Sequence, residues 1–121
     1  MPVKKIMVVD DSPTERLILT DLLTRNGYIV VAADSGEKAI AMSREELPDL
    51  IIMDVVMPGM NGFQATRTIS RQETTSQIPI IMCTSKDLET DKIWAMRQGA
   101  QSYLVKPADH DELLAKIASF N

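Results

Sequence analysis

The stretch KIMVVDD, residues 5–11, is a short apolar run that ends in two adjacent aspartates, Asp10 and Asp11. Other apolar runs also end in polar or charged residues: 50–53 (LIIM) before Asp54, 78–83 before Thr84, and 102–105 before Lys106. If these runs are parallel strands, their carboxyl ends share one edge of a sheet, which is where open α/β sheets build their sites. We therefore expect these polar ends to form one site.

Apolar runs of strand length alternate along the chain with segments of helical periodicity. The predicted strands are residues 3–9, 28–33, 50–54, 78–84 and 102–105. The predicted helices are a first helix that begins at Ser12-Pro13 and ends at Asn26-Gly27, and then residues 36–46, 63–71, 88–98 and 109–120. Repeated strand–helix units predict an α/β fold, with a parallel sheet and helices on both of its faces.

The apolar residues of two predicted helices indicate which face each helix buries. The first helix is expected to bury Leu17, Ile18 and Leu22. The helix over residues 88–98 is expected to bury Ile93, Met96 and Ala100. Trp94 is then left on the outer side, where a tryptophan indicates either a protein contact or partial packing against a neighbouring helix.

Length and charge limit the class of protein. A chain of 121 residues predicts one domain, residues 1–121. The net charge of −4 gives no reason to expect nucleic-acid binding, which needs a basic face. The single cysteine, Cys83, cannot form an internal disulfide, which fits a cytoplasmic setting. No apolar run approaches the ~20 residues of a membrane helix, so membrane insertion is not expected.

A carboxylate at the end of a buried strand is costly unless it has a partner or a chemical role. Asp10 and Asp11 alone could simply favour the start of a helix, but Asp54 adds a third carboxylate at the same sheet edge. Two carboxylates about 4 Å apart repel by roughly 4 kcal/mol at an effective dielectric constant of 20. Because Mg²⁺ relieves such repulsion, the residues predict a Mg²⁺ and phosphoryl site with Asp54 as nucleophile.

Lys106 and Thr84 each have an ordinary explanation when taken alone. A lone lysine is usually solvated, and a threonine at a buried strand end usually has a satisfied hydroxyl. Pro107 raises the chance of a cis peptide bond, which would direct Lys106 back over the sheet edge. Together with the carboxylates, these residues favour a functional site.

Four segments, VVDDS (8–12), MDVVMPGMNG (53–62), MCTS (82–85) and YLVKP (103–107), carry a family resemblance. They resemble the receiver domain of two-component response regulators, and the resemblance covers the whole chain. It implies a flavodoxin-like (βα)5 fold with strand order 2-1-3-4-5, as in the chemotaxis regulator CheY.

The resemblance also implies roles for the site residues. Asp54 would be the phosphoacceptor, and Lys106 would contact the phosphoryl group. Asp10, Asp11, Asp54 and the backbone carbonyl of Val56 would hold Mg²⁺. A carboxylate nucleophile is a recognised covalent route, and a metal with a lysine can neutralise the charge of a transferring phosphoryl group.

A switch follows from the same resemblance. The phosphoryl dianion would be hydrogen-bonded by Thr84, and the movement of Thr84 would let Tyr103 turn inward. Tyr103 and Trp94 would then belong to an output face that contacts another protein. Both states are expected to exist before phosphorylation, which shifts their populations.

The implied function is a phosphorylation-dependent signalling switch of the stand-alone CheY type. Its expected partners are a histidine kinase and a downstream protein, and the chain is expected to be a monomer. It is not expected to be an enzyme beyond its own phosphoryl transfer and slow autodephosphorylation. The segments FQATR (63–67) and 86–100 resemble regulators of pilus-based twitching more than flagellar ones, so the pathway is expected to be chemotaxis-like or pilus-based.

Two positions differ from the flagellar chemotaxis pattern. Val56 is apolar and cannot orient an attacking water, and Lys86 is basic where that regulator type has an acid. These differences predict slow loss of the phosphoryl group. The usual phosphatase partner is correspondingly not expected.

Three alternatives remain open from the residues. The chain could be a receiver cut from a longer regulator or hybrid kinase. It could be a Mg²⁺-dependent aspartyl phosphohydrolase, although such enzymes usually carry a second acid two residues after the nucleophile, where this chain has Val56. It could also be a pseudo-receiver that only binds partners, against which the full set of site residues argues.

Overall fold

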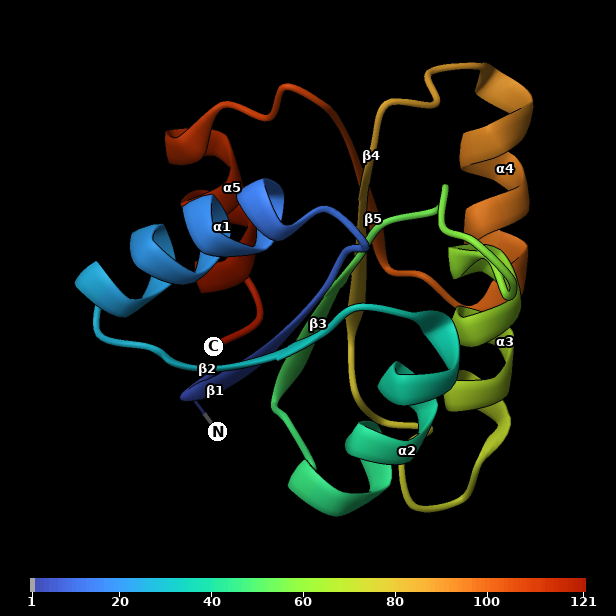
Figure 1. The fold of residues 1–121 in the computed structure, drawn as a ribbon, viewed down its shortest axis with the longest axis horizontal. Helices are drawn as coiled ribbons and strands as arrows, with labels where there is room; N and C mark the ends of the chain where they lie inside the picture. The colour runs from blue at the N-terminus through green and yellow to red at the C-terminus, as the bar shows by residue number, and fades with distance from the viewer. Residues whose placement is uncertain (1) are drawn as a thin grey trace.

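The computed structural model describes residues 2–121. Its strands form one parallel sheet in the order β2-β1-β3-β4-β5 (Figure 1), which confirms the predicted order. The strands are β1 (Lys5–Val9), β2 (Ile29–Ala33), β3 (Leu50–Met53), β4 (Ile80–Thr84) and β5 (Ser102–Val105).

The register of the sheet aligns the carboxyl ends of its central strands. Val9 of β1 pairs with Met53 of β3, and Met53 pairs with Met82 of β4. Next to the outermost strand, Thr84 of β4 pairs with Val105 of β5. The residues that follow β1, β3 and β5 therefore leave the sheet along one edge.

Two predicted strands begin two residues earlier than the observed ones, and the predicted strand 28–33 begins one residue before β2. The Val3 N–H bonds to the Asn121 side chain at 2.8 Å instead of to a neighbouring strand, so β1 starts at Lys5. The Ile78 N–H closes a turn on the Thr75 carbonyl at 3.1 Å, and Pro79 has no N–H to donate. Strand β4 therefore begins only at Ile80.

The helices cover both faces of the sheet, as predicted. Figure 1 shows α1 and α5 on one side and α2, α3 and α4 on the other. Their bounds are α1 (Pro13–Arg25), α2 (Gly36–Glu46), α3 (Gly62–Arg71), α4 (Glu89–Gln98) and α5 (His110–Ala118). No helix among the described residues is long and apolar enough to cross a membrane.

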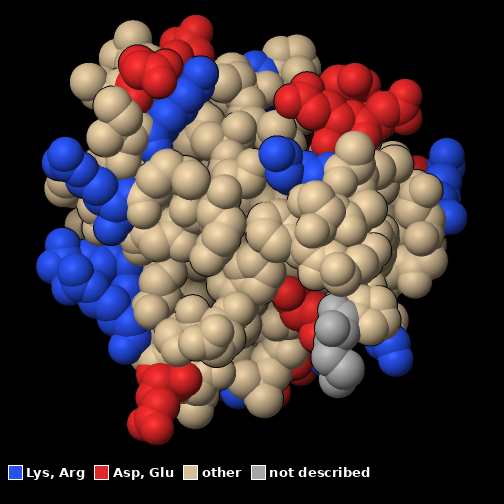
Figure 2. All heavy atoms as spheres, turned by 180° about the vertical axis from the view of Figure 1, so that it is seen from behind, with Lys and Arg blue, Asp and Glu red and all other residues tan. Residues whose placement is uncertain are grey.

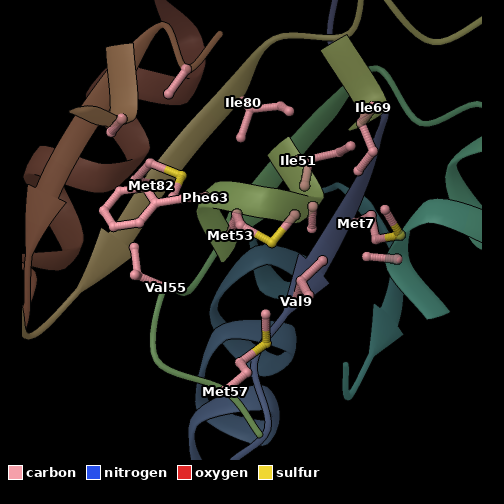
Figure 3. Close-up of a cluster of buried hydrophobic side chains, with 14 of the residues drawn as sticks. Met7, Val9, Ile51, Met53, Val55, Met57, Phe63, Ile69, Ile80 and Met82 are labelled. Atoms are coloured by element: carbon pink, nitrogen blue, oxygen red, sulfur yellow. The ribbon is translucent and has the colours of Figure 1, made fainter. Parts of the chain in front are cut away.

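Each face of the sheet has its own apolar core, because successive residues of a strand point to opposite faces. Figure 3 shows the core on the side of α2, α3 and α4, where Met7, Ile51 and Met82 meet Phe63 and Ile69. On the opposite side, α1 and α5 pack against the alternate residues of the same strands. These include Ile6, Ile52 and Ile81, with Leu23 and Leu113 from the helices. The central strands are thus buried on both faces.

The predicted buried faces of α1 and α4 were wrong at two residues each, whereas Leu22 packs against the core and Ala100 is buried, as predicted. Helix α1 buries Leu19 and Leu23 and exposes Leu17 and Ile18. Helix α4 buries Ala95 and Gln98, whereas Ile93 and Met96 are exposed.

The rotation of α4 is set by close packing at its end. A Cβ atom placed on Gly99 would lie 2.4 Å from the Ser70 Oγ atom of α3. Gly99 thus lies close against α3, and the small Ala95 is buried in the core on the same side of the sheet, which leaves Ile93 and Met96 outside. Hydrophobic spacing alone could not show this.

Candidate functional site

Three carboxylates meet at the carboxyl edge of the sheet. Asp10 directly follows β1 and is 2% exposed, Asp54 directly follows β3 and is 8% exposed, and Asp11 is exposed. One carboxylate oxygen from each residue lies within 4.8 Å of the other two. The structure thus brings together the three acids that the sequence singled out.

Lys106 reaches the same point from the end of β5. Its Nζ atom lies 2.6 Å from Asp10 Oδ2 and 3.4 Å from Asp54 Oδ2. The Lys106-Pro107 peptide bond is cis. One ammonium group therefore lies between two buried carboxylates and offsets part of their mutual repulsion.

Backbone groups hold the remaining carboxylate oxygens. The Ser12 N–H donates to Asp10 Oδ1 at 2.9 Å, and the Val55 N–H donates to Asp54 Oδ1 at 2.8 Å. Each buried carboxylate is therefore oriented by one backbone donor and by Lys106. Because the carboxylates are held in this way, the direction from which another group can approach Asp54 is fixed.

Burial and charge act in opposite directions on the protonation of this site. Burial raises the pKa of Asp54 above its usual value, the charge of Lys106 opposes that rise, and the charge of Asp10 adds to it. Burial disfavours the charged form of Lys106, but the hydrogen bond to Asp10 and the charge of Asp54 outweigh it and raise the pKa of Lys106. Lys106 is therefore a cation at neutral pH.

Gly62 and Arg16 are parts of the site that the sequence reasoning missed. A Cβ atom on Gly62 would lie 2.0 Å from the Asp54 carbonyl oxygen, so only glycine lets the loop after β3 pass this close. The Gly62 N–H closes the loop on the Val55 carbonyl at 2.9 Å. Arg16 Nη1 donates to the Asp10 carbonyl at 2.8 Å. The turn signal at 59–62 could have indicated Gly62, but nothing in the spacing indicated Arg16.

The family model of the response regulator receiver domain matches residues 6–118. The chain belongs to this family. Protein PilH of Pseudomonas aeruginosa is 51% identical over 113 residues, which make up 93% of this chain and 93% of that protein. Several other curated relatives are longer, and the chain spans only 25% to 48% of their length.

Solved structures agree with this membership. The chemotaxis protein CheY4 of Vibrio cholerae superposes with a TM-score of 0.92 at 32% identity, over 98% of this chain and 99% of that one. The receiver domain of the sensor histidine kinase PA1611 of Pseudomonas aeruginosa superposes with a TM-score of 0.90 at 30% identity, over 98% and 97% of the two chains. That structure has a magnesium ion coordinated in its active-site cleft.

The donor atoms of this receiver suit a hard divalent cation. Carboxylate oxygens are the ligands that Mg²⁺ prefers, and Mg²⁺ usually takes only one or two of them together with water and phosphate oxygens. Asp11 is exposed beside the buried pair, so a cation can approach from solvent. The predicted carbonyl ligand, Val56, lies in the adjoining loop, and its side chain is 56% exposed.

Thr84 and Tyr103 of this receiver both contact Lys86. Thr84 is buried at the end of β4, and its Oγ1 atom accepts a hydrogen bond from the Lys86 N–H at 3.4 Å. The Tyr103 hydroxyl donates to the Lys86 carbonyl at 2.7 Å. Burial raises the pKa of Tyr103 to about 12, so the hydroxyl stays protonated at neutral pH and continues to donate.

A cavity of about 460 Å³ lies beside Lys106, between α1 and the start of α5. Its lining includes the apolar Ile18, Leu19 and Leu113, with Cys83. Burial raises the pKa of the Cys83 thiol to about 11, so it is a neutral part of the wall. The hollow provides an apolar surface next to the acidic site.

Helix α4 carries a group of exposed apolar side chains. Trp94 is 47% exposed, as the sequence predicted, and Ile93 and Met96 are exposed to a similar extent. Figure 2 shows the molecule from behind, with α4 on the left, and the middle of this face is largely uncharged. Exposed apolar side chains that gather on one part of a surface mark a candidate protein contact.

Proposed function

We propose that this chain is a phosphorylation-dependent signalling switch in which Asp54 accepts a phosphoryl group from a histidine kinase. The observation that carries the proposal is the meeting of Asp10, Asp11, Asp54 and Lys106 at the carboxyl edge of a receiver-family sheet. Asp10, Asp11, Asp54 and the Val56 carbonyl would hold Mg²⁺. When bound, the ion supplies charge neutralisation for the transferring phosphoryl group.

The chain's own residues would act in the transfer as follows. An ionised oxygen of Asp54 forms a bond to the phosphorus of a phosphohistidine while the P–N bond breaks, and the histidine nitrogen leaves with the electron pair and takes up a proton. Lys106 holds the carboxylate in place before transfer and pairs with the phosphoryl oxygens afterwards. We propose no catalysis beyond this self-phosphorylation and its slow reversal by water.

The switch would connect Thr84 to Tyr103 through Lys86, which both residues contact. A phosphoryl oxygen near Asp54 offers Thr84 an acceptor, and the Thr84 hydroxyl would turn toward it. That movement breaks the bond from the Lys86 N–H and frees the loop whose Lys86 carbonyl Tyr103 holds, so that Tyr103 would turn inward. The loop between β4 and α4 would shift as a result, and α4 would present Trp94 differently to a downstream protein.

The pathway we propose is a pilus-motility or chemotaxis-like one, with the chain acting as a cytoplasmic monomer. The 51% identity to Protein PilH, over nearly all of both chains, supports this choice. The apolar Val56 beside Asp54 supports a long-lived phosphorylated state. Replacing Val56 by asparagine would supply a group that can orient water, and phosphoryl loss should then become faster.

Acetyl phosphate with Mg²⁺ tests the proposal directly. Wild type should gain one phosphoryl group by intact-mass measurement, and Asp54→Asn should gain none because the amide is not a nucleophile. Asp21→Asn is the matched control, since Asp21 is an exposed aspartate outside the site, and it should label like wild type. Equal labelling of wild type and Asp54→Asn would refute the assignment of Asp54.

A further inference from the structure

Arg16 contacts the site from the second turn of α1. Its Nη1 atom donates to the Asp10 carbonyl oxygen at 2.8 Å, and the side chain is half-buried. This carbonyl belongs to the peptide that joins Asp10 to Asp11. The orientation of that peptide determines the direction in which the Asp11 side chain leaves the backbone.

The other polar groups of Asp10 are already held by different partners. Its N–H donates to the Ala33 carbonyl at 3.2 Å, and its carboxylate accepts from the Ser12 N–H and from Lys106. Within residues 2–121, Arg16 supplies the hydrogen bond to the Asp10 carbonyl. Asp11 itself is exposed, so its place beside Asp10 and Asp54 depends on the peptide that precedes it.

The charge of Arg16 also reaches the loop after β2 at this edge of the sheet. The hydrogen bond from Lys38 chiefly lowers the pKa of Asp34, which follows β2, and the charge of Arg16 lowers it further. Its guanidinium group therefore acts on the loop after β1 and on the loop after β2.

We propose that Arg16 is a positioning residue for divalent-cation binding: by holding the Asp10 carbonyl it sets the place of Asp11 among the three carboxylates. The inference rests on the proposed Mg²⁺ site. The proposal predicts that loss of Arg16 weakens Mg²⁺ binding, whereas the loss of its charge alone would strengthen it. A cation near the site repels Mg²⁺, so loss of Arg16 would tighten binding if its charge were all that mattered. Loss of a positioning group weakens binding instead.

The test is the dissociation constant of Mg²⁺ alone, measured by titration calorimetry on the full chain. Arg16→Met should bind Mg²⁺ about tenfold more weakly than wild type, which is the lower end of the effect of removing such supports. Arg25→Met is the matched control, because Arg25 lies on the same helix in an exposed pair with Asp21 and its loss removes the same charge. It should bind Mg²⁺ as wild type does.

A second variant separates positioning from folding. Arg16→Lys keeps the charge but offers a shorter donor, so its affinity should lie between those of wild type and Arg16→Met. It also provides the test if Arg16→Met does not fold, and wild-type affinity in the lysine variant would then refute the proposal. Urea unfolding without Mg²⁺ measures the stability of each variant separately.

Two outcomes distinguish the failure of this proposal from that of the function. Unchanged or tighter Mg²⁺ binding in folded Arg16→Met, with wild type binding normally, would overturn the role of Arg16 and leave the switch intact. Absence of Mg²⁺ binding in wild type itself would overturn the proposed site. A loss of stability in Arg16→Met without a change in Mg²⁺ affinity would also overturn the positioning role.

Discussion

The carboxyl edge of the sheet and the outer face of α4 both depart from the usual distribution of polar and apolar residues, in opposite directions. At the sheet edge, the carboxylates of Asp10 and Asp54 are buried. On α4, the large apolar side chains of Ile93, Trp94 and Met96 are exposed. Either arrangement costs stability, because buried charges lose their hydration and exposed apolar groups order water.

The two regions differ in what offsets this cost in stability. The buried carboxylates have a partner inside the chain, since Lys106 contacts both. The apolar side chains of α4 face solvent in the part of the chain that the structure describes. The cost at the sheet edge is therefore offset within the chain, whereas the apolar side chains of α4 form the surface at which we propose that a second protein binds.

Replacing Lys106 should give the largest loss of stability, because its charge offsets the burial of two carboxylates at the sheet edge. Lys106→Met leaves Asp10 and Asp54 buried without their cation, and we expect the free energy of unfolding to fall by about 3 kcal/mol. Urea unfolding without Mg²⁺ measures this loss. Lys92→Met is the control, because its pair with Glu89 is exposed and should contribute less than about 1 kcal/mol. Equal stability of the two variants would mean that water already relieves the carboxylates.

Replacing Trp94 should weaken the binding of a second protein and leave the stability of the fold nearly unchanged. Trp94→Ala is expected to keep wild-type labelling by acetyl phosphate and to change stability by less than about 0.5 kcal/mol. Binding to the protein captured by phosphorylated wild type should weaken by about 2 kcal/mol if Trp94 is an anchor of the contact. Leu17→Ala, which truncates an exposed side chain on α1, is the control. Wild-type affinity in Trp94→Ala would place the output face elsewhere.

Mg²⁺ should raise the stability of the protein, because it neutralises carboxylate charge at the sheet edge and has no proposed site on α4. At ten times its dissociation constant it should raise the free energy of unfolding by about 1.4 kcal/mol, provided that the unfolded chain does not bind it. Asp11→Ala should lose most of that gain, since Asp11 is one of the three clustered carboxylates. Thermal unfolding with and without Mg²⁺ measures both. The same Mg²⁺-dependent shift in Asp11→Ala and wild type would contradict a site at this edge.

The pH dependence of stability should give the smallest effect. The pKa of Asp54 is raised in the folded state from a usual value of 3.8, so the folded protein holds this proton more tightly than the unfolded chain does. Its contribution to stability is therefore present below pH 3.8 and is lost as the pH rises through the folded-state pKa. Asp54→Asn, which stays neutral, should be more stable than wild type at pH 7.

The difference between Asp54→Asn and wild type should shrink as the pH is lowered from neutral toward 3.8, because wild-type Asp54 takes up its proton within this range. Unfolding curves of the two proteins across this range measure it. A constant difference at all pH values would show that Asp54 does not titrate differently in the two states.

Much of the fold could be predicted from local signals. Strands such as 50–53 are apolar throughout, as strands buried on both faces are, and Ser12-Pro13 marks the start of α1. The order of the strands came from the family resemblance. The meeting of Asp10, Asp54 and Lys106 followed from parallel strands sharing one edge, although the roles of these residues remain predictions.

Strand length, apolar runs and turn residues act locally, and they were enough to predict the α/β alternation, the parallel sheet and the edge at which the polar residues gather. The rotation of α4 depends on tertiary packing, since Gly99 lies close to Ser70, which is far from it in the chain. The tertiary structure also decided that Arg16 reaches the Asp10 carbonyl. A long side chain can donate to several acceptors, and which one it meets depends on how the helix packs against the sheet.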